Sequence, residues 1–136
     1  MSPECQVVFS AGGRTHSPRY CDAGACLPVR LRGGGIQVLP WGRRTEEAGR
    51  LPAGGWAALE AIHAGEWQRW QPLPVKVPVT VLYLADLHGD RLAVTPVMGQ
   101  CLQGLVARIA LERRVYLVAL PPLESDVPLP CWPRLV

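Results

Sequence analysis

Short apolar runs separated by glycine and proline dominate this sequence. Fourteen glycines and fourteen prolines occur among its 136 residues, and each proline ends a helix or restricts a strand to an edge position. The pattern therefore predicts mostly strands and turns. Valine, leucine and tyrosine are enriched in six segments that suit half-buried strands. These segments are residues 5–11, 26–32, 35–41, 75–86, 99–110 and 113–120.

Glycine clusters between these runs favour turns. The stretches "GGRTHSP" and "RGGG" contain adjacent glycines, which supply backbone angles with positive φ. The stretch "LHGDR", residues 87–91, predicts a hairpin turn with Gly89 and Asp90 at its tip.

One segment has helical periodicity. In "GGWAALEAIHAGEWQRW", residues 54–70, aromatic and apolar residues recur near a period of 3.6. This pattern predicts one main helix near residues 55–70, ended or bent at Gly65, with its tryptophans packed on a sheet. The alternative is a helix from Trp56 to Trp70 that presents aromatic side chains to a protein partner.

The composition is that of a globular protein. Apolar residues make up 49% and charged residues 18%, which excludes a disordered chain and predicts one domain over residues 1–136 of the α+β class, predominantly β. The net charge of +3 permits a nucleic-acid partner without requiring one. We expect a cytoplasmic protein, because no export signal or stretch of 18 apolar residues occurs.

The cysteines raise the hypothesis of a thiol enzyme. Cys5 or Cys21 as nucleophile, with His16 as base, is the nearest candidate set in the sequence. The alternative is that each cysteine is buried and structural. Cys21 and Cys26 lack the second pair of ligands that a zinc site needs. No phosphate loop or dinucleotide fingerprint occurs either, so we expect no metal and no cofactor.

Arginines in the first third of the chain indicate a nucleic-acid contact. They are Arg14, Arg19, Arg30, Arg32, Arg43 and Arg44. The planar guanidinium group suits phosphate, and in "LPWGRR", residues 39–44, an aromatic ring for base stacking precedes two arginines. The alternatives are a solubilising surface for the arginines and an inward packing for Trp41.

The order of several short motifs resembles that of the SOS-response-associated peptidase (SRAP) family. "RYCDAGACLPV" at 19–29 is similar to the family's "RYNxAPxQxxPV", and "LPWGRR" to its "RWGLIPxW". "GGWAALEAI" lies in the region of "NARAET", and "VKVPVTVLYLADLHGD" resembles "CLVPADGFYEWxxxxG". "LQGLVARIALERRVYLVALPP" resembles "FAGLWExxxxxxxxTIITTEA", and the closing "LPCWPRLV" resembles "HDRMPVIL".

The resemblance implies a compact fold of curved, barrel-like antiparallel sheets with a positively charged groove for single-stranded DNA. Family members crosslink abasic DNA through a cysteine that follows the initiator methionine, assisted by asparagine, glutamate and histidine. At the corresponding positions this chain has Ser2, Gly54 or Gly55, Leu84 and Leu129.

These replacements imply the loss of the family's chemistry, because serine is a weaker nucleophile than a thiolate and glycine and leucine transfer no proton. The resemblance thus implies a non-catalytic protein that binds single-stranded or abasic-site DNA. Its expected DNA contacts are Arg19, Trp41, Arg43 and Arg44. A protein-interaction module on the same fold and a thiol enzyme with a relocated cysteine are the alternatives.

Overall fold

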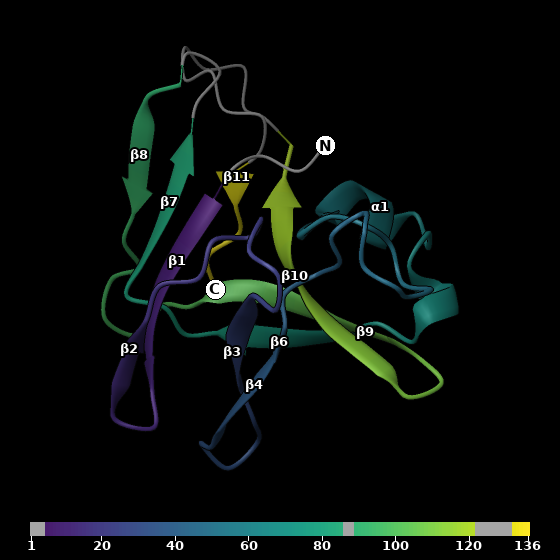
Figure 1. Cartoon of the computed structure of the whole chain (residues 1–136), viewed down its shortest axis with the longest axis horizontal. Coiled ribbons are helices and arrows are strands. Elements are labelled where there is room, and N and C mark those ends of the chain that lie inside the picture. The colour runs from purple at the N-terminus through teal and green to yellow at the C-terminus, as the bar shows by residue number, and fades with distance from the viewer. Residues whose placement is uncertain (1–4, 86–88, 122–131) are drawn as a thin grey trace.

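Antiparallel strands make up most of the computed structural model, which describes residues 5–85, 89–121 and 132–136 (Figure 1). The first strands are β1 (Cys5–Ala11), β2 (Arg14–His16), β3 (Cys26–Arg30), β4 (Ile36–Pro40) and β5 (Trp56–Ala58). A short helix α1 (Leu59–His63) and a 3-10 turn η1 (Gln68–Trp70) follow. The later strands are β6 (Leu73–Val77), β7 (Val81–Ala85), β8 (Arg91–Val94), β9 (Leu102–Ile109), β10 (Glu112–Leu120) and β11 (Trp132–Pro133).

One sheet has four strands in the order β2-β1-β7-β8, all antiparallel. Side chains alternate between its faces because successive residues of a strand point in opposite directions. On β1, Cys5, Val7 and Phe9 are buried, whereas Gln6 and Val8 are half-buried. One face of this sheet therefore belongs to the core, and the other faces outward.

The second sheet has the strand order β11-β10-β9-β6, and β5 pairs with β10 in parallel. The hairpin of β3 and β4 forms a separate two-stranded sheet that contacts β6 and β10. The structure is thus mostly β with mixed pairing. Its described strands form separate sheets and no closed barrel.

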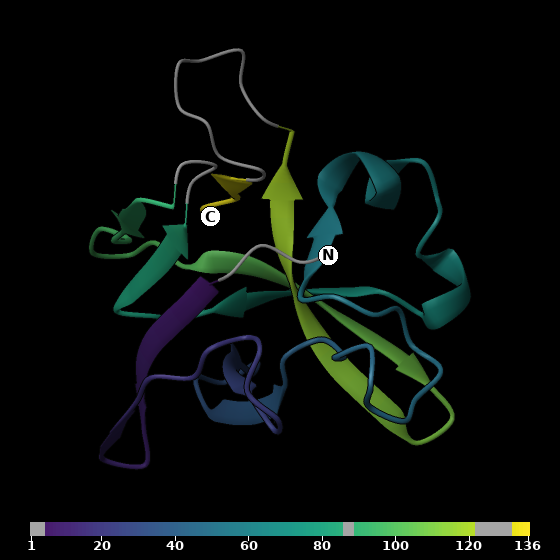
Figure 2. The same cartoon turned by 45° about the horizontal axis from the view of Figure 1, so that its top comes forward.

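Two clusters of buried side chains hold these sheets together. The larger cluster lies among the four-stranded sheet, the β3–β4 hairpin and β10, and contains Trp41. The smaller cluster contains Leu51, Trp67 and Tyr116 and packs the segment from β5 to η1 onto β9 and β10. Figures 1 and 2 show α1 across β10 from the four-stranded sheet.

The predicted main helix near residues 55–70 is present only in part. Trp56–Ala58 forms a strand because it pairs with Leu117–Ala119 of β10. The helix α1 is only five residues long, and Gly65, with φ +82°, follows its end. A surface helix from Trp56 to Trp70 is therefore not available for a protein partner.

Trp67 and Trp70 of this segment pack on the sheet, as predicted. Trp67 is buried, and its ring meets Tyr116 edge to face at 4.9 Å. Trp70 contacts Trp67 in the same manner at 5.4 Å. Aromatic pairs with this geometry add to the stability gained from burial alone.

The strand predicted at 5–11 forms β1 with the same ends, and the other strand predictions hold with shifted ends. Residues 75–86 contribute to two strands, β6 and β7, which lie in different sheets on either side of Pro78. Around the expected turn at 87–91, β7 and β8 pair with Ala85 opposite Arg91. Gly89 has φ +86°, and residues 86–88 lie outside the described part of the chain.

Candidate nucleic-acid interface

Trp41 is fully buried in the core. Its indole N–H donates to the carbonyl oxygen of Gly55 at 3.0 Å, and its ring meets Tyr20 edge to face at 5.7 Å. A buried indole with a satisfied N–H is part of the packing and has no free face for a base. The expectation that Trp41 contacts DNA is therefore wrong.

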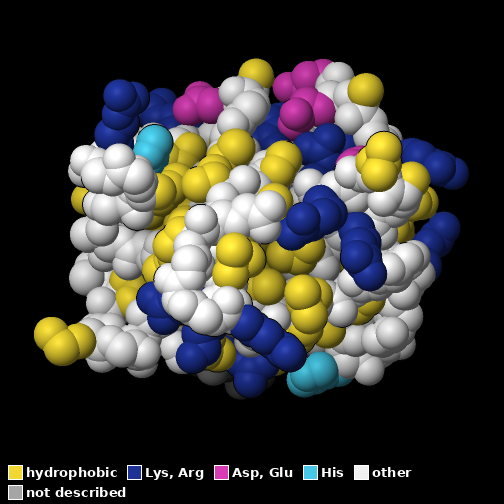
Figure 3. Space-filling view, turned by 90° about the horizontal axis from the view of Figure 1, so that it is seen from below, with side chains coloured by type: hydrophobic (Ala, Val, Ile, Leu, Met, Phe, Trp, Pro, Cys, Tyr) yellow, Lys and Arg dark blue, Asp and Glu magenta, His cyan; other side chains and the backbone are white. Residues whose placement is uncertain are grey.

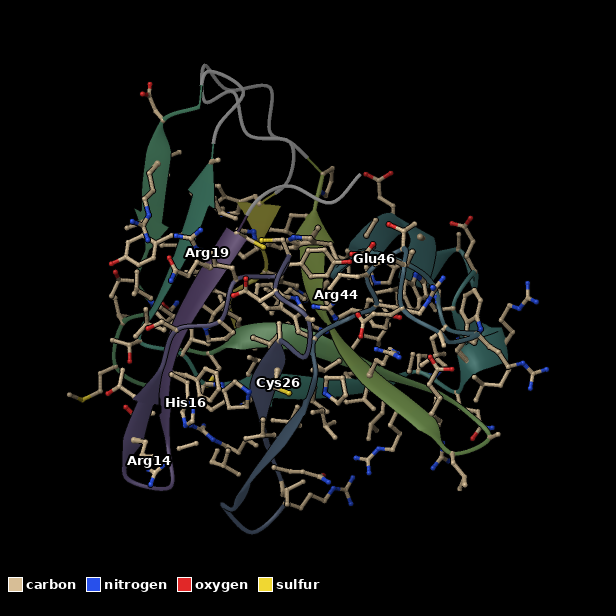
Figure 4. The ribbon with its side chains drawn as sticks, viewed as in Figure 1. Arg14, His16, Arg19, Cys26, Arg44 and Glu46 are labelled. Atoms are coloured by element: carbon tan, nitrogen blue, oxygen red, sulfur yellow. The ribbon has the colours of Figure 1, made fainter. Side chains whose placement is uncertain are left out.

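Arg44 is also internal, with 4% of its surface exposed (Figure 4). Its guanidinium donates to the carbonyl oxygens of Tyr20 at 2.7 Å, Asp22 at 3.3 Å, Trp41 at 2.5 Å and Gly42 at 3.0 Å. It forms an ion pair with Glu47 and lies 4.7 Å from the centre of the Tyr20 ring. These contacts join the loop at 20–22 to the loop at 41–47, so Arg44 is not a phosphate contact.

Arg43 is half-buried and bonds to the protein itself. Its Nε–H donates to the Leu51 carbonyl at 2.8 Å, and its Nη1 donates to the Glu47 carbonyl at 2.8 Å. Its backbone exchanges two hydrogen bonds with Gly54, at 3.1 and 2.8 Å. The Arg43 side chain thus holds the loop at 47–54, which leaves Arg19 as the one exposed member of the expected DNA contacts.

Gly42 explains the tight turn in "LPWGRR". Its φ is +53°, and a Cβ built there would lie 2.0 Å from the Gly54 carbonyl oxygen. Its N–H donates to the Val115 carbonyl at 2.8 Å, which continues the path of the chain beside β10. Only glycine allows two backbone segments to approach so closely.

Two glutamates bind the backbone and arginines of this region. The backbone N–H of Arg44 donates to the Glu47 carboxylate at 2.8 Å. This hydrogen bond is the largest cause of a lowered pKa for Glu47, although burial acts in the opposite direction. The side chains of Arg44 and Arg114 lower the pKa further. Burial alone would raise the pKa of Glu112. The N–H groups of Arg50 and Leu51 and the Arg114 guanidinium outweigh burial, and the pKa is lowered.

Stability is expected to fall in acid for this reason. Because the folded pKa values of Glu47 and Glu112 lie below their ordinary value of 4.5, their contribution is present above that value and is lost as pH falls through the folded values. Urea unfolding between pH 7 and pH 2.5 measures the effect. Glu112→Gln should lower stability near neutral pH and flatten its decline in acid, whereas the exposed Glu60→Gln should do neither. An unchanged profile for Glu112→Gln would contradict this origin.

Cys5 and His16 do not come together as a nucleophile and base. His16 lies opposite Phe9 on β2, with its ring stacked on Phe9 at 5.0 Å. Cys5 is four residues away from Phe9 along β1, which is about 13 Å of strand. Cys21 is exposed in the loop that follows Tyr20, and Cys5 is buried.

Cys26 is the cysteine that shares a hollow with His16, although the sequence did not single it out as a nucleophile. Burial raises the pKa of its thiol against the opposing effect of Arg44, and its Sγ–H donates to the Gly24 carbonyl at 3.3 Å. A raised pKa disfavours the thiolate, which is the reactive form. Among the described residues, no three His, Cys, Asp or Glu side chains group as metal ligands.

The positions that correspond to the SRAP reactive residues have different surroundings. Leu84 is buried on β7, directly opposite Cys5 of β1. Gly55 is buried, and a Cβ there would lie 2.7 Å from the Tyr20 ring. Ser2 and Leu129 lie outside the described residues.

A cationic groove lies between the β3 end of the two-stranded hairpin and the five-stranded sheet. It has a volume of about 900 Å³. Its basic residues are Arg30 and Arg32 from the β3–β4 hairpin, Lys76 on β6, Arg113 on β10 and Arg134 after β11. No Asp or Glu lines it within the described part of the chain. Figure 3 shows Lys and Arg bordering hydrophobic patches on this side, with the acidic groups in view gathered at one edge.

Apolar side chains form the floor of this groove. Leu73 is 57% exposed and Leu31 43% exposed, although both lie beside the core. Val75 and Val106 line the same groove, where β6 and β9 pair with Leu73 opposite Val106. The groove thus combines positive charge at its rim with an exposed apolar surface below.

Gln103 adds an unsatisfied polar atom to the same groove. It lies on β9 opposite Lys76, and its Oε1 is buried with no hydrogen-bond partner among the described residues. A buried acceptor without a partner costs about 1–3 kcal/mol.

None of the four expected DNA contacts lines this groove. Arg30 and Arg32 belong to the arginine-rich first third, whereas Lys76, Arg113 and Arg134 come from three other parts of the chain. Only the pairing of β6, β9, β10 and β11 places those three beside the β3–β4 hairpin. No local motif indicates such a grouping.

Comparisons of the chain with protein-family models, with curated proteins and with solved structures found no match. No helix among the described residues has the length and apolar character needed to cross a membrane.

Proposed function

We propose that this protein is a non-catalytic, SRAP-like protein that binds single-stranded DNA in the groove between the β3–β4 hairpin and the five-stranded sheet. The observation that carries the proposal is the grouping of five basic side chains with no acidic one among the described residues that line the groove. Arginine and lysine side chains neutralise the phosphates of a nucleic-acid backbone. The motif resemblance supports DNA as the polymer.

The floor of the groove favours a single strand over a duplex. In a duplex, stacking and pairing hide the faces and edges of the bases, whereas a single strand can turn them toward Leu31 and Leu73. Binding without reaction agrees with the loss of the family's reactive groups at Gly55 and Leu84.

A salt titration of DNA binding tests the proposal. A twelve-nucleotide mixed-sequence single strand with a 5′-hydroxyl is titrated by fluorescence anisotropy between 50 and 200 mM NaCl. If all five cations contact phosphates, log K should fall with log salt at a slope of about −3.5, which is roughly a 100-fold loss of affinity over this range. Single-stranded DNA should also bind more tightly than the duplex of the same sequence.

Two results would overturn the proposal. The first is no binding at 50 mM NaCl, and the second is binding whose affinity does not change with salt. Equal affinity for single strand and duplex would reduce the groove to a general polyanion surface and contradict the role given to Leu31 and Leu73. Leu73→Gln is the matched variant, since it should lower the preference for single strand and leave the salt slope unchanged.

A further inference from the structure

The outward face of the four-stranded sheet carries a separate pair of arginines. Gln6 lies opposite Tyr83 on β7 and bridges to Arg19 on its other side. Arg91 of β8 lies opposite Ala85, two residues from Tyr83. Residues directly opposite each other on paired strands share a face of the sheet, and so do residues two apart on one strand. The side chains of Gln6, Arg19, Tyr83 and Arg91 therefore belong to one face. The intervening residues Cys5 and Leu84 are buried on the other face.

Contacts on this face fix the side chain of Arg91. Its Nη2 donates to Gln6 Oε1 at 2.8 Å, and its guanidinium carbon lies 3.7 Å from the centre of the Tyr83 ring. Gln6 Nε2 in turn donates to the Ser17 carbonyl at 3.1 Å. The bond to Gln6 occupies one of the five N–H donors of the guanidinium. Arg91 is thus held in place before any ligand arrives, which reduces the entropy cost of binding.

Arg19 lies on the other side of Gln6 and is exposed (Figure 4). Its backbone N–H donates to the Asp22 carboxylate at 3.2 Å, whereas its guanidinium makes no ion pair within the described part of the chain. A pocket of about 220 Å³ is lined by Gln6, Arg19, Tyr83 and Arg91 together with buried neighbours. None of its described lining residues is acidic.

We propose that this pocket binds a phosphate monoester. A doubly charged phosphate offers three terminal oxygens as acceptors, and two planar guanidinium groups match them with paired N–H donors. The pocket is smaller than the roughly 300–1,000 Å³ of sites for drug-sized ligands, so it takes the phosphate and the first atoms attached to it. The shared chemistry fits two sources, a free small phosphate and the 5′-phosphate at the end of a DNA strand.

The site differs from the proposed DNA groove in every basic residue. Arg19 and Arg91 lie on the four-stranded sheet, whereas the groove uses the β3–β4 hairpin and the five-stranded sheet. The inference therefore does not rest on the groove. A variant with the groove cations replaced should keep its affinity for phosphate.

Isothermal titration calorimetry with inorganic phosphate tests the first source, in a buffer free of phosphate and sulfate. Arg91→Gln and Arg19→Gln should each weaken phosphate binding by about tenfold, because each removes charge-assisted hydrogen bonds. Arg91→Lys should recover only part of the affinity, since lysine keeps the charge and loses the planar fork. The exposed Arg69→Gln is the control and should bind like wild type.

The second source is tested with twelve-nucleotide strands that carry a 5′-phosphate or a 5′-hydroxyl. A tighter complex with the 5′-phosphate, and loss of that gain in Arg91→Gln, assigns the pocket to strand ends. Binding of inorganic phosphate with no gain from the 5′-phosphate assigns it to free phosphates. The proposal is overturned if neither probe binds, or if Arg19→Gln and Arg91→Gln bind as tightly as wild type. Circular dichroism confirms that these exposed substitutions leave the fold intact.

Discussion

Replacing Arg44 by methionine is expected to lower the free energy of unfolding by about 3–5 kcal/mol, the range for breaking a buried ionic network by removing one partner. The substitution removes the guanidinium that donates to four carbonyl oxygens and pairs with the Glu47 carboxylate. The Arg114 guanidinium still donates to Gly42, and the Arg44 backbone N–H still donates to Glu47. Domains of this kind have total stabilities of about 5–15 kcal/mol, so much of the margin disappears. Urea unfolding followed by tryptophan fluorescence measures the change.

Two variants separate the network from a simple loss of charge. Arg44→Lys keeps the charge but cannot reach all the carbonyls that the guanidinium reaches, so it should recover only part of the stability. Arg50→Met removes an exposed arginine nearby and should change stability by less than about 0.5 kcal/mol. A loss below about 1 kcal/mol for Arg44→Met would show that solvent replaces the missing donors.

The sequence predicted strands where local chemistry decides them. Residues 5–11 are apolar at alternate positions and bounded by paired glycines, and they form β1 with the same ends. The helix predicted at 54–70 is much shorter in the structure, because helical periodicity is a local pattern. The pairing of Trp56–Ala58 with β10 depends on residues far along the chain. Pairing with a distant strand outweighs helical propensity, and no nearby residue signals it.

The sequence could not distinguish a binding arginine from a structural one. Arginines are mostly exposed, so "LPWGRR" indicated a surface contact. Arg44 is internal because the loop at 20–22 brings two carbonyl oxygens to it, and Trp41 is internal because Gly55 accepts its N–H. Both partners lie in other segments of the chain. Exposure of Arg30 and Arg32, in contrast, follows from their place at the end of β3 and in the adjacent turn.

Simultaneous replacement of Arg30, Arg32 and Lys76 by glutamine is expected to weaken single-stranded DNA binding by about 1,000-fold. Each lost charge-assisted contact is worth roughly tenfold or more. The slope of log K against log salt should also fall in magnitude, from about 3.5 to about 1.4, because two cations remain in the groove. Fluorescence anisotropy at 50 mM NaCl measures both quantities with the same 5′-hydroxyl strand.

The matched control removes three charges elsewhere. Arg14, Arg50 and Arg69 are exposed and lie outside the groove, so their joint replacement by glutamine makes the same change in net charge. If attraction depends on net charge alone, the two triple variants will lose affinity equally, and the groove is not the binding site. If DNA binding depends on cations in the groove, the control variant keeps most of its affinity and nearly the wild-type salt slope. The reason is that the phosphates interact mainly with cations within a Debye length of the bound DNA strand.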